Sequence, residues 1–298
     1  MRLVYLGTPE AAVPPLRALV AAGHDVALVV TRPDKKRGRG SALAPSPVSA
    51  VATELRIPVT STVDDLLALG PRPDLGVVVA YGRIIRPHVL QGVPMVNLHF
   101  SLLPAWRGAA PVERAILAGD TETGVCLMAL EEGLDTGGIY RVERVAIDPD
   151  ESVEELRARL VVIGTATLVS ALASGASGLG PAAPQEGEPT YAAKIESSEL
   201  AIDWNRTAAH VRRTVHLGRA WTTAAGRRLI VWRTAGGELT DLLPGTVAPG
   251  NAVACGDGRT VVLVEVQPEG KSRQPAAAWF RGARLRPGTD RLNSEGAF

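Results

Sequence analysis

The sequence predicts an α/β fold in its first part and a small β domain in its last part, on three observations. A strand, a helix and a second strand follow one another within the first 30 residues, which is typical of a parallel sheet. A stretch rich in Gly, Ser and Pro over residues 174–189 indicates a linker. After it, short apolar runs alternate with turn residues, as in a barrel or sandwich.

Local signals define the first strand–helix–strand unit. Residues 3–6 form a short apolar strand that ends in a turn. Pro14 fits the first turn of a helix, where no amide donor is needed, and the helix continues to Ala22. Gly23 is the expected residue just past a helix end, and residues 26–30 form the second strand.

The same patterns predict the remaining elements. In the first part we expect strands at residues 75–80, 93–98, 125–130 and 140–147, and helices at 48–55, 109–118 and 152–172. In the last part we expect a helix at 207–216 and strands at 228–232, 245–248, 252–255 and 261–267. The predicted division is a first domain over residues 1–175, a linker over 176–205 and a C-terminal β domain over 206–298.

Composition places the chain among ordinary globular proteins. It has 298 residues, of which 46% are hydrophobic and 21% charged. The longest largely apolar run, residues 161–173, is too short to cross a membrane, and the N-terminus lacks the pattern of a signal peptide. Because Cys126 and Cys255 are isolated, we expect no disulfide, no metal knuckle and a cytoplasmic location.

The net charge of +1 hides an asymmetry along the chain. Residues 200–298 carry 14 Lys and Arg against 8 Asp and Glu, a balance of +6. Residues 1–199 carry 18 against 23, a balance of −5. A basic C-terminal part indicates a polyanionic partner, although an Arg-rich composition without any partner fits as well.

The first turn does not carry the fingerprint of a dinucleotide site. Residues 6–10 read LGTPE and lack the second and third glycines of G-x-G-x-x-G, which allow close approach to a pyrophosphate. The phosphate loop G-x-x-x-x-G-K-[ST] is absent as well. The strand and helix at this turn therefore predict a parallel sheet without a bound dinucleotide.

The most informative polar residues are Asn97 and His99, at the end of the predicted strand 93–98. Residues two apart on a strand face the same way, so both side chains should project together while Leu98 points to the other side. Ligands of open α/β sheets bind at the carboxyl ends of strands. An amide and an imidazole at that position are able to hold a developing oxyanion.

Asp135 lies in the Gly-rich loop 133–138, after the predicted strand 125–130. We expect this loop at the same edge of the sheet as His99, where the carboxylate would orient and charge the imidazole or relay a proton. The three side chains together predict acyl transfer without a side-chain nucleophile. A hydrogen-bonded structural histidine and a turn-forming aspartate fit the same residues.

A basic loop (residues 32–40) follows the strand 26–30. It holds one carboxylate and five cations, namely Arg32, Lys35, Lys36, Arg37 and Arg39. Such a loop is able to grip phosphates, and a solvated loop without a partner fits equally well. The ring of Trp106, just after a turn at Pro104, fits either the wall of a pocket for a flat ligand or a cover over the core.

Several motifs together resemble a known family. Asn97-Leu98-His99, then Ser101-Leu102-Leu103-Pro104, then Asp135 in its Gly-rich loop match the signature of 10-formyltetrahydrofolate-dependent formyltransferases. Four further stretches narrow the match: residues 6–10 (LGTPE), 106–111 (WRGAAP), 190–194 (TYAAK) and 202–204 (IDW). Over nearly its whole length the chain resembles the methionyl-tRNA formyltransferase family, although the C-terminal domain matches only loosely outside the linker region.

The resemblance implies a Rossmann-like sheet with helices on both faces and a C-terminal barrel of oligonucleotide-binding type. It implies formyl transfer from 10-formyltetrahydrofolate to the α-amine of methionine on initiator tRNA. We expect no metal, because the sequence has no cluster of metal ligands, and we expect a monomer, because nothing in the sequence indicates more. Catalysis would fall to Asn97, a protonated His99 and Asp135. The folate would lie against Ser101, Leu102, Leu103 and Pro104, while the basic loop and the C-terminal domain would help to hold the tRNA.

Other functions stay open at this point. Another formyl-folate transferase would act on a sugar nucleotide or on glycinamide ribonucleotide, and a formyl-folate hydrolase would use the same first domain. A glycinamide ribonucleotide enzyme would resemble the chain only up to the linker, and a sugar-nucleotide enzyme would not need the basic loop. A non-catalytic RNA-binding protein on the same scaffold would not need all three polar residues.

Overall fold

The computed structural model describes residues 1–36 and 43–293, and the chain divides into two compact units. Unit 1 comprises Met1–Val112, Glu122–Ala146 and Glu155–Ala193, and unit 2 comprises Glu113–Thr121, Ile147–Glu154 and Lys194–Phe298. The segment predicted as a linker, residues 176–205, is shared between them: its first part is built into unit 1.

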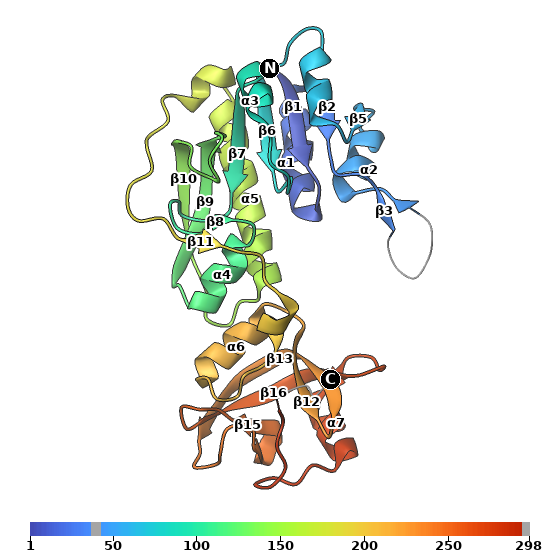
Figure 1. The fold of residues 1–298 in the computed structure, drawn as a ribbon, viewed down its shortest axis with the longest axis vertical. Helices are drawn as coiled ribbons and strands as arrows, with labels where there is room; N and C mark the ends of the chain where they lie inside the picture. Colours follow the sequence, from blue (N-terminus) through green and yellow to red (C-terminus); the bar gives the residue numbers. More distant parts are fainter. Residues whose placement is uncertain (37–42, 294–298) are drawn as a thin grey trace. The chain divides into compact units, whose positions relative to one another are not determined.

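Within the described residues, the centre of unit 1 is a seven-stranded sheet in the order β10-β9-β7-β6-β1-β2-β5 (Figure 1). The strands from β7 to β5 are parallel, whereas β9 runs antiparallel to both β7 and β10. The bounds are β1 (Arg2–Gly7), β2 (Asp25–Val30), β5 (Val59–Thr60), β6 (Leu75–Val79), β7 (Met95–His99), β9 (Glu122–Ala129) and β10 (Ile139–Ala146). The predicted α/β class with a mostly parallel sheet is confirmed.

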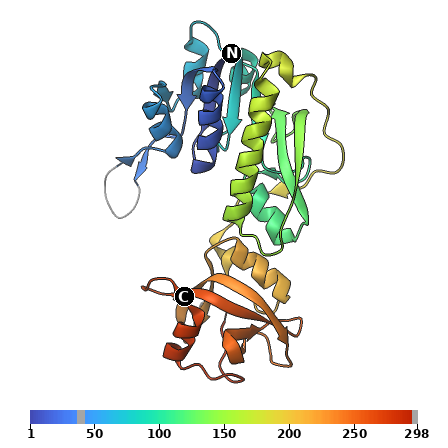
Figure 2. The ribbon, with the colours of Figure 1, turned by 180° about the vertical axis from the view of Figure 1, so that it is seen from behind.

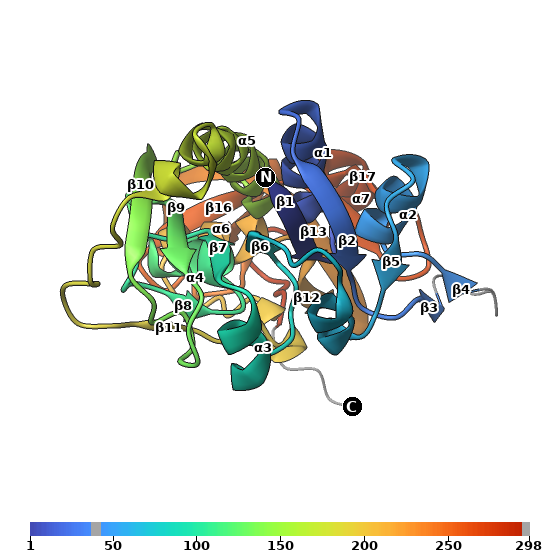
Figure 3. The same cartoon turned by 90° about the horizontal axis from the view of Figure 1, so that it is seen from above.

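Helices cover both faces of this sheet (Figures 2 and 3). On one face lie α1 (Val13–Ala21), α2 (Pro47–Glu54) and α5 (Val153–Leu172), and on the other lies α3 (Pro87–Gly92). A further helix, α4, spans Pro111–Ala118. The sequence patterns predicted these elements except β5 and α3, which are too short to show a clear period.

The packing of α5 determines which way the side chains of β7 point. A Cβ atom on Gly164 of α5 would lie 2.9 Å from the side chain of Leu98 and 3.1 Å from that of Val125. Leu98 therefore faces α5. Because side chains alternate along a strand, its neighbours Asn97 and His99 face away from α5, toward the opposite side of the sheet.

Two short strand pairs in unit 1 lie outside the main sheet. The strand β8 (Arg107–Gly108) pairs in parallel with β11 (Tyr191–Ala192), and β3 (Lys35–Lys36) pairs antiparallel with β4 (Leu43–Ala44). The β8–β11 pair ties the middle of the predicted linker segment to the turn after β7. None of these pairs was predicted, because two-residue strands carry no readable alternation.

Unit 2 is built on an antiparallel sheet that forms a half-barrel, in agreement with the predicted small β domain. Its order is β12-β13-β16-β15-β14, with β17 paired to β16. The long strand β13 bends at register shifts near Arg233 and Gly236. The elements are α6 (Ala208–His216), β12 (Ala220–Ala224), β13 (Arg227–Leu239), β14 (Val247–Ala248), β15 (Ala252–Ala254), β16 (Arg259–Pro268), β17 (Gln274–Pro275) and α7 (Ala276–Ala283).

The cores of both units are largely aliphatic. The side chains of Leu3, Val4 and Leu6 in β1 are completely buried, and so are those of Val231 and Val261 in unit 2. Among the helices of the described residues, none has the length and the apolar character needed to cross a membrane.

Candidate active site

Asn97 and His99 occupy the carboxyl end of β7, which lies between β6 and β9. Asn97 is opposite Val78 of β6, and His99 is opposite Cys126 of β9. His99 is buried, with 5% of its surface exposed, and Asn97 is half-buried. Both face the side of the sheet on which the segment 106–108 and the loop of Asp135 lie.

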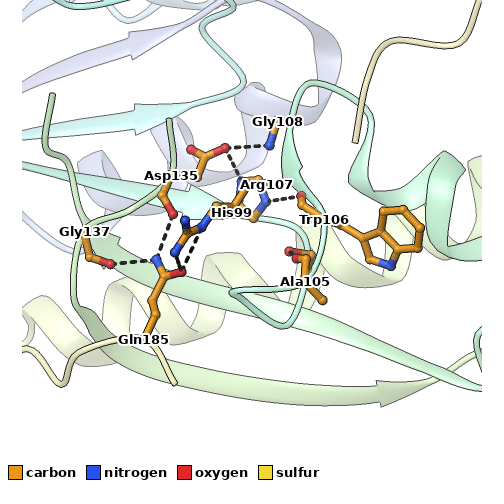
Figure 4. A network of polar contacts seen from close by, with 9 residues as sticks. His99, Ala105, Trp106, Arg107, Gly108, Asp135, Gly137 and Gln185 are labelled. Atoms are coloured by element: carbon orange, nitrogen blue, oxygen red, sulfur yellow. Dashed lines mark hydrogen bonds and ion pairs between the residues drawn. The ribbon is translucent and has the colours of Figure 1, made fainter. Parts of the chain in front are cut away.

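The imidazole of His99 touches two fixed groups (Figure 4). Its Nε2 atom lies 3.1 Å from the carbonyl oxygen of Trp106, and its Nδ1 atom lies 3.6 Å from Oδ2 of Asp135. A carbonyl only accepts hydrogen bonds, so Nε2 carries the proton of a neutral ring. The lone pair of Nδ1 is then on the side of Asp135.

The carboxylate of Asp135 is held by the backbone of the neighbouring segment. Its Oδ2 atom accepts a hydrogen bond of 2.8 Å from the amide of Gly108. Asp135 itself has a positive φ of 51°, and Gly108 has a φ of 124°, which favours glycine. One short segment therefore supplies both the carbonyl that orients His99 and the amide that orients Asp135.

The route by which Asp135 reaches His99 corrects our expectation for this loop. We expected the strand before it to end at the same edge as β7, but β9 is antiparallel to β7. The loop thus starts at the amino end of β7, where the amide of Leu130 donates to the carbonyl of Met95 at 2.9 Å. It then folds back over the sheet to bring Asp135 to His99. At Gly137 this path leaves no room for a Cβ, which would lie 2.0 Å from the carbonyl oxygen of Ala129.

Burial decides the charge state of His99. Burial lowers the pKa of the imidazole, while the carboxylate of Asp135 and the carbonyl of Trp106 raise it, and the effect of burial is the largest. His99 is therefore neutral near pH 7. This direction favours a neutral ring at rest, whereas the resemblance led us to expect a protonated one beside the carboxylate at 3.6 Å.

The turn after β7 holds the predicted folate-binding residues, and several of their side chains are packed within the protein. Ser101 is fully buried and its hydroxyl donates to the carbonyl of Ala105 at 2.6 Å. Leu103 packs in a small cluster with Cys126 and Met128. The side chain of Leu102 closes over Gly124, where a Cβ would lie 2.4 Å from it. The side chains of these three residues thus build the turn itself.

Trp106 is half-buried and has a positive φ of 62°. In Figure 4 its indole ring points away from His99 and Asp135, while its carbonyl points toward His99. The part of Trp106 that serves this polar cluster is therefore its backbone.

The basic loop is described only in part. Arg37 and Arg39 lie outside the described residues, and Lys35 and Lys36 form β3. Arg32 is half-buried, and its amide lies 3.4 Å from the hydroxyl of Thr8. Its Nε atom is buried and has no hydrogen-bond partner among the described residues. Its backbone is thus anchored beside the turn after β1.

Two side chains of the cluster in Figure 4 received no role from the sequence: that of Arg107, which was noted only within the stretch 106–111, and that of Gln185. Gln185 lies in the segment that composition marks as a linker. A pattern search offers no signal for it, because its partners lie about 50 and 78 positions away. The tertiary contacts of this segment, among them the pairing of β11 with β8, show that it is anchored beside the site.

Catalysis by a cysteine thiol or by a metal ion finds less support in the described residues. Burial raises the pKa of the Cys126 thiol to about 11 and that of Cys255 to about 12, so both thiols stay protonated near neutral pH. No group of three or more His, Cys, Asp or Glu side chains in the described residues is arranged to hold a metal ion.

Comparisons with known proteins find matches to both parts of the chain. A family model described as formyl transferase matches residues 1–172, and one described as formyl transferase, C-terminal domain, matches residues 194–284. A methionyl-tRNA formyltransferase of Jannaschia sp. (strain CCS1) is 43% identical over 97% of this chain and 99% of its own. That of Symbiobacterium thermophilum is 41% identical over 97% of this chain and 94% of its own.

A solved structure shares the fold at low identity. It is an N-formyltransferase from Helicobacter canadensis in complex with folinic acid and dTDP-3-aminofucose. It covers 89% of this chain and 98% of its own, with a TM-score of 0.66 and 15% identity. The likeness to this structure concerns the fold, whereas the family models and the curated relatives match both parts of the sequence. The chain belongs to the formyl transferase family.

Proposed function

We propose that this protein transfers a formyl group from 10-formyltetrahydrofolate to the α-amine of methionine carried by initiator tRNA. The observation that carries the proposal is the 43% identity to a methionyl-tRNA formyltransferase over 97% of this chain and 99% of that protein, because it includes the C-terminal part. A relative that matched the first domain alone would not indicate which acceptor receives the formyl group.

In the proposed reaction, the amine attacks the formyl carbon while His99 takes its proton. Nδ1 of the neutral imidazole has the free lone pair, since Nε2 donates to the carbonyl of Trp106. The imidazolium that forms lies 3.6 Å from the carboxylate of Asp135, which stabilises the new positive charge. Burial favours the neutral ring, which is therefore available to take up a proton, and the carboxylate stabilises the imidazolium once it has formed.

The oxygen of the formyl group becomes an oxyanion during the attack. We assign its stabilisation to the amide of Asn97 and to the imidazolium of His99, which face the same side of β7. The bond between the formyl carbon and the folate nitrogen then breaks, and His99 returns the proton to that nitrogen. The products are tetrahydrofolate and formylmethionyl-tRNA, and the mechanism requires no metal.

The binding partners are assigned by the same reasoning. The folate would contact the turn of Ser101, Leu102, Leu103 and Pro104 mainly through backbone groups, because these side chains are largely committed to packing. The basic loop and the +6 balance of residues 200–298 would hold the phosphates of the tRNA. The active species would be a monomer in the cytoplasm, where initiator tRNA is used.

The decisive experiment is an acceptor comparison with purified protein and 10-formyltetrahydrofolate. We expect formylation of methionyl initiator tRNA, and no transfer to an amino-sugar nucleotide or to glycinamide ribonucleotide. Transfer to the amino-sugar nucleotide alone would replace the proposal by the sugar-modifying alternative. Hydrolysis of the donor without any acceptor would favour a hydrolase.

A further inference from the structure

Gln185 uses its whole amide to join two separate parts of the cluster (Figure 4). Its Oε1 atom accepts hydrogen bonds from Nε and Nη2 of Arg107, at 3.1 and 2.6 Å. Its Nε2 atom donates to the carbonyls of Asp135 and Gly137, at 2.8 and 2.9 Å. Each hydrogen-bonding group of this amide is therefore engaged, and the two ends bind different segments.

The loop of Asp135 needs such a support. It leaves the sheet after β9 and returns at β10, and between them Asp135 adopts the left-handed backbone region. A non-glycine residue keeps this conformation only where its surroundings hold it. The amide of Gly108 holds the carboxylate from one side, and Gln185 holds the carbonyl of the same residue from the other.

The segment that carries Gln185 is itself anchored at both ends. Ala183 and Ile139 exchange two backbone hydrogen bonds, of 2.7 and 2.9 Å, which attach the segment to the start of β10. Further along the chain, the hydroxyl of Thr190 accepts from the amide of Trp106 at 2.8 Å. Gln185 lies between these anchors, so its amide is fixed relative to both the loop and the segment 106–108.

We propose that Gln185 is a positioning residue that holds the loop of Asp135 against Arg107 and so sets the distance between the Asp135 carboxylate and His99. Gln185 does not touch the reacting groups in this proposal. Its effect on turnover rests on the proposed function, whereas its effect on the His99–Asp135 pair does not. The two effects are therefore measured separately.

The variants are chosen to divide the two ends of the amide. Gln185→Leu removes all of its hydrogen bonds with little change in volume. Gln185→Glu keeps the contact with Arg107 but places an oxygen against the carbonyls of Asp135 and Gly137, so it releases the loop end alone. The matched control is Gln267→Leu, since Gln267 likewise accepts from a side chain, Trp232, and donates to a carbonyl, that of Lys271, within unit 2.

The kinetic test compares kcat at saturating folate and tRNA. Since a small misplacement of a catalytic group costs about 10²-fold, we expect kcat to fall by that order in both Gln185 variants, with KM for both substrates near the wild-type value. Gln267→Leu should leave kcat unchanged. A wild-type kcat in Gln185→Glu would overturn the proposal, and this variant serves alone if Gln185→Leu does not fold.

The second test needs no turnover and follows the titration of His99 by NMR, assigned with His99→Gln. In the wild-type background, Asp135→Asn removes the carboxylate and should lower the pKa of His99. In the Gln185→Glu background the same substitution should shift it much less, because the carboxylate is already displaced. An equal shift in both backgrounds would contradict the positioning role, even if the protein proved to have a different acceptor.

Discussion

Among the described residues of unit 1, two His–Asp pairs differ in environment. His88 of α3 contacts Asp64 at the surface, where the two side chains are 50% and 51% exposed. His99 and Asp135 are 5% and 12% exposed, and backbone groups hold both of them. In the surface pair, the hydrogen bond from His88 lowers the pKa of Asp64, whereas in the inner pair burial lowers the pKa of His99.

The comparison shows that chemistry depends on the surroundings of a pair and not on its residue types. Water reaches both side chains of the surface pair, and an exposed pair of this kind contributes little to stability. In the inner pair, burial favours the neutral ring, and backbone groups fix its orientation. If the ring takes up a proton, the nearby carboxylate of Asp135 stabilises the positive charge. We therefore expect substitutions in the two pairs to have very different effects on turnover.

The largest effects should come from the groups that contact the reacting carbon. Removal of one oxyanion donor lowers turnover by about 10²–10³-fold, so Asn97→Ala and His99→Ala should fall in that range or below, with the fold intact. His88→Ala should retain the wild-type rate. Steady-state formylation and circular dichroism test this, and near-normal turnover in His99→Ala would remove His99 from the mechanism.

Asp135→Asn should have the next largest effect on turnover. It keeps the shape but removes the negative charge that stabilises the imidazolium, and we expect kcat to fall by about 10²-fold. Because the carboxylate raises the pKa of His99, its removal should lower that pKa further. The matched control is Asp64→Asn. If both variants turned over equally fast, burial of the pair would have no catalytic meaning.

Charge that acts at a distance should have a smaller effect. Replacement of Lys35, Lys36, Arg37 and Arg39 by Gln should leave turnover at saturating tRNA nearly unchanged but weaken tRNA binding. The slope of log affinity against log salt should become shallower by about 0.7–0.9 for each phosphate that the loop no longer neutralises. Binding measured between low and physiological salt tests this, and an unchanged slope would exclude phosphate binding by this loop.

The smallest effect concerns stability at acid pH. The pKa of His99 is lowered by folding, so the unfolded chain binds a proton that the native state does not once the pH falls below about 6.5. Above that pH, His99 does not reduce the free energy of unfolding. As the pH falls further, the free energy of unfolding decreases by up to about 1.4 kcal/mol for each pH unit. His99→Gln should flatten the decline measured by urea unfolding, and a decline that stays as steep would place its cause elsewhere.

Much of unit 1 could be predicted from local patterns. The first strand–helix–strand unit, β6, β7 and α5 follow from apolar periodicity and from helix-boundary residues such as Pro14 and Gly23. The shared orientation of Asn97 and His99 follows from the two-residue period of a strand. Each of these features depends on neighbours within one element, so the sequence contains them directly.

The direction of β9, the charge of His99 and the role of Gln185 were decided by the tertiary structure. The antiparallel β9 makes the loop of Asp135 fold back over the sheet. The apolar run that forms β9 does not indicate whether the strand lies parallel or antiparallel to its neighbours. The neutral state of His99 arises from side chains packed around it, and Gln185 meets partners 50 and 78 positions away. The sequence by itself determines which residue types are present and which of them share the face of a strand. The distances between these side chains and their exposure to water are defined only once the chain has folded.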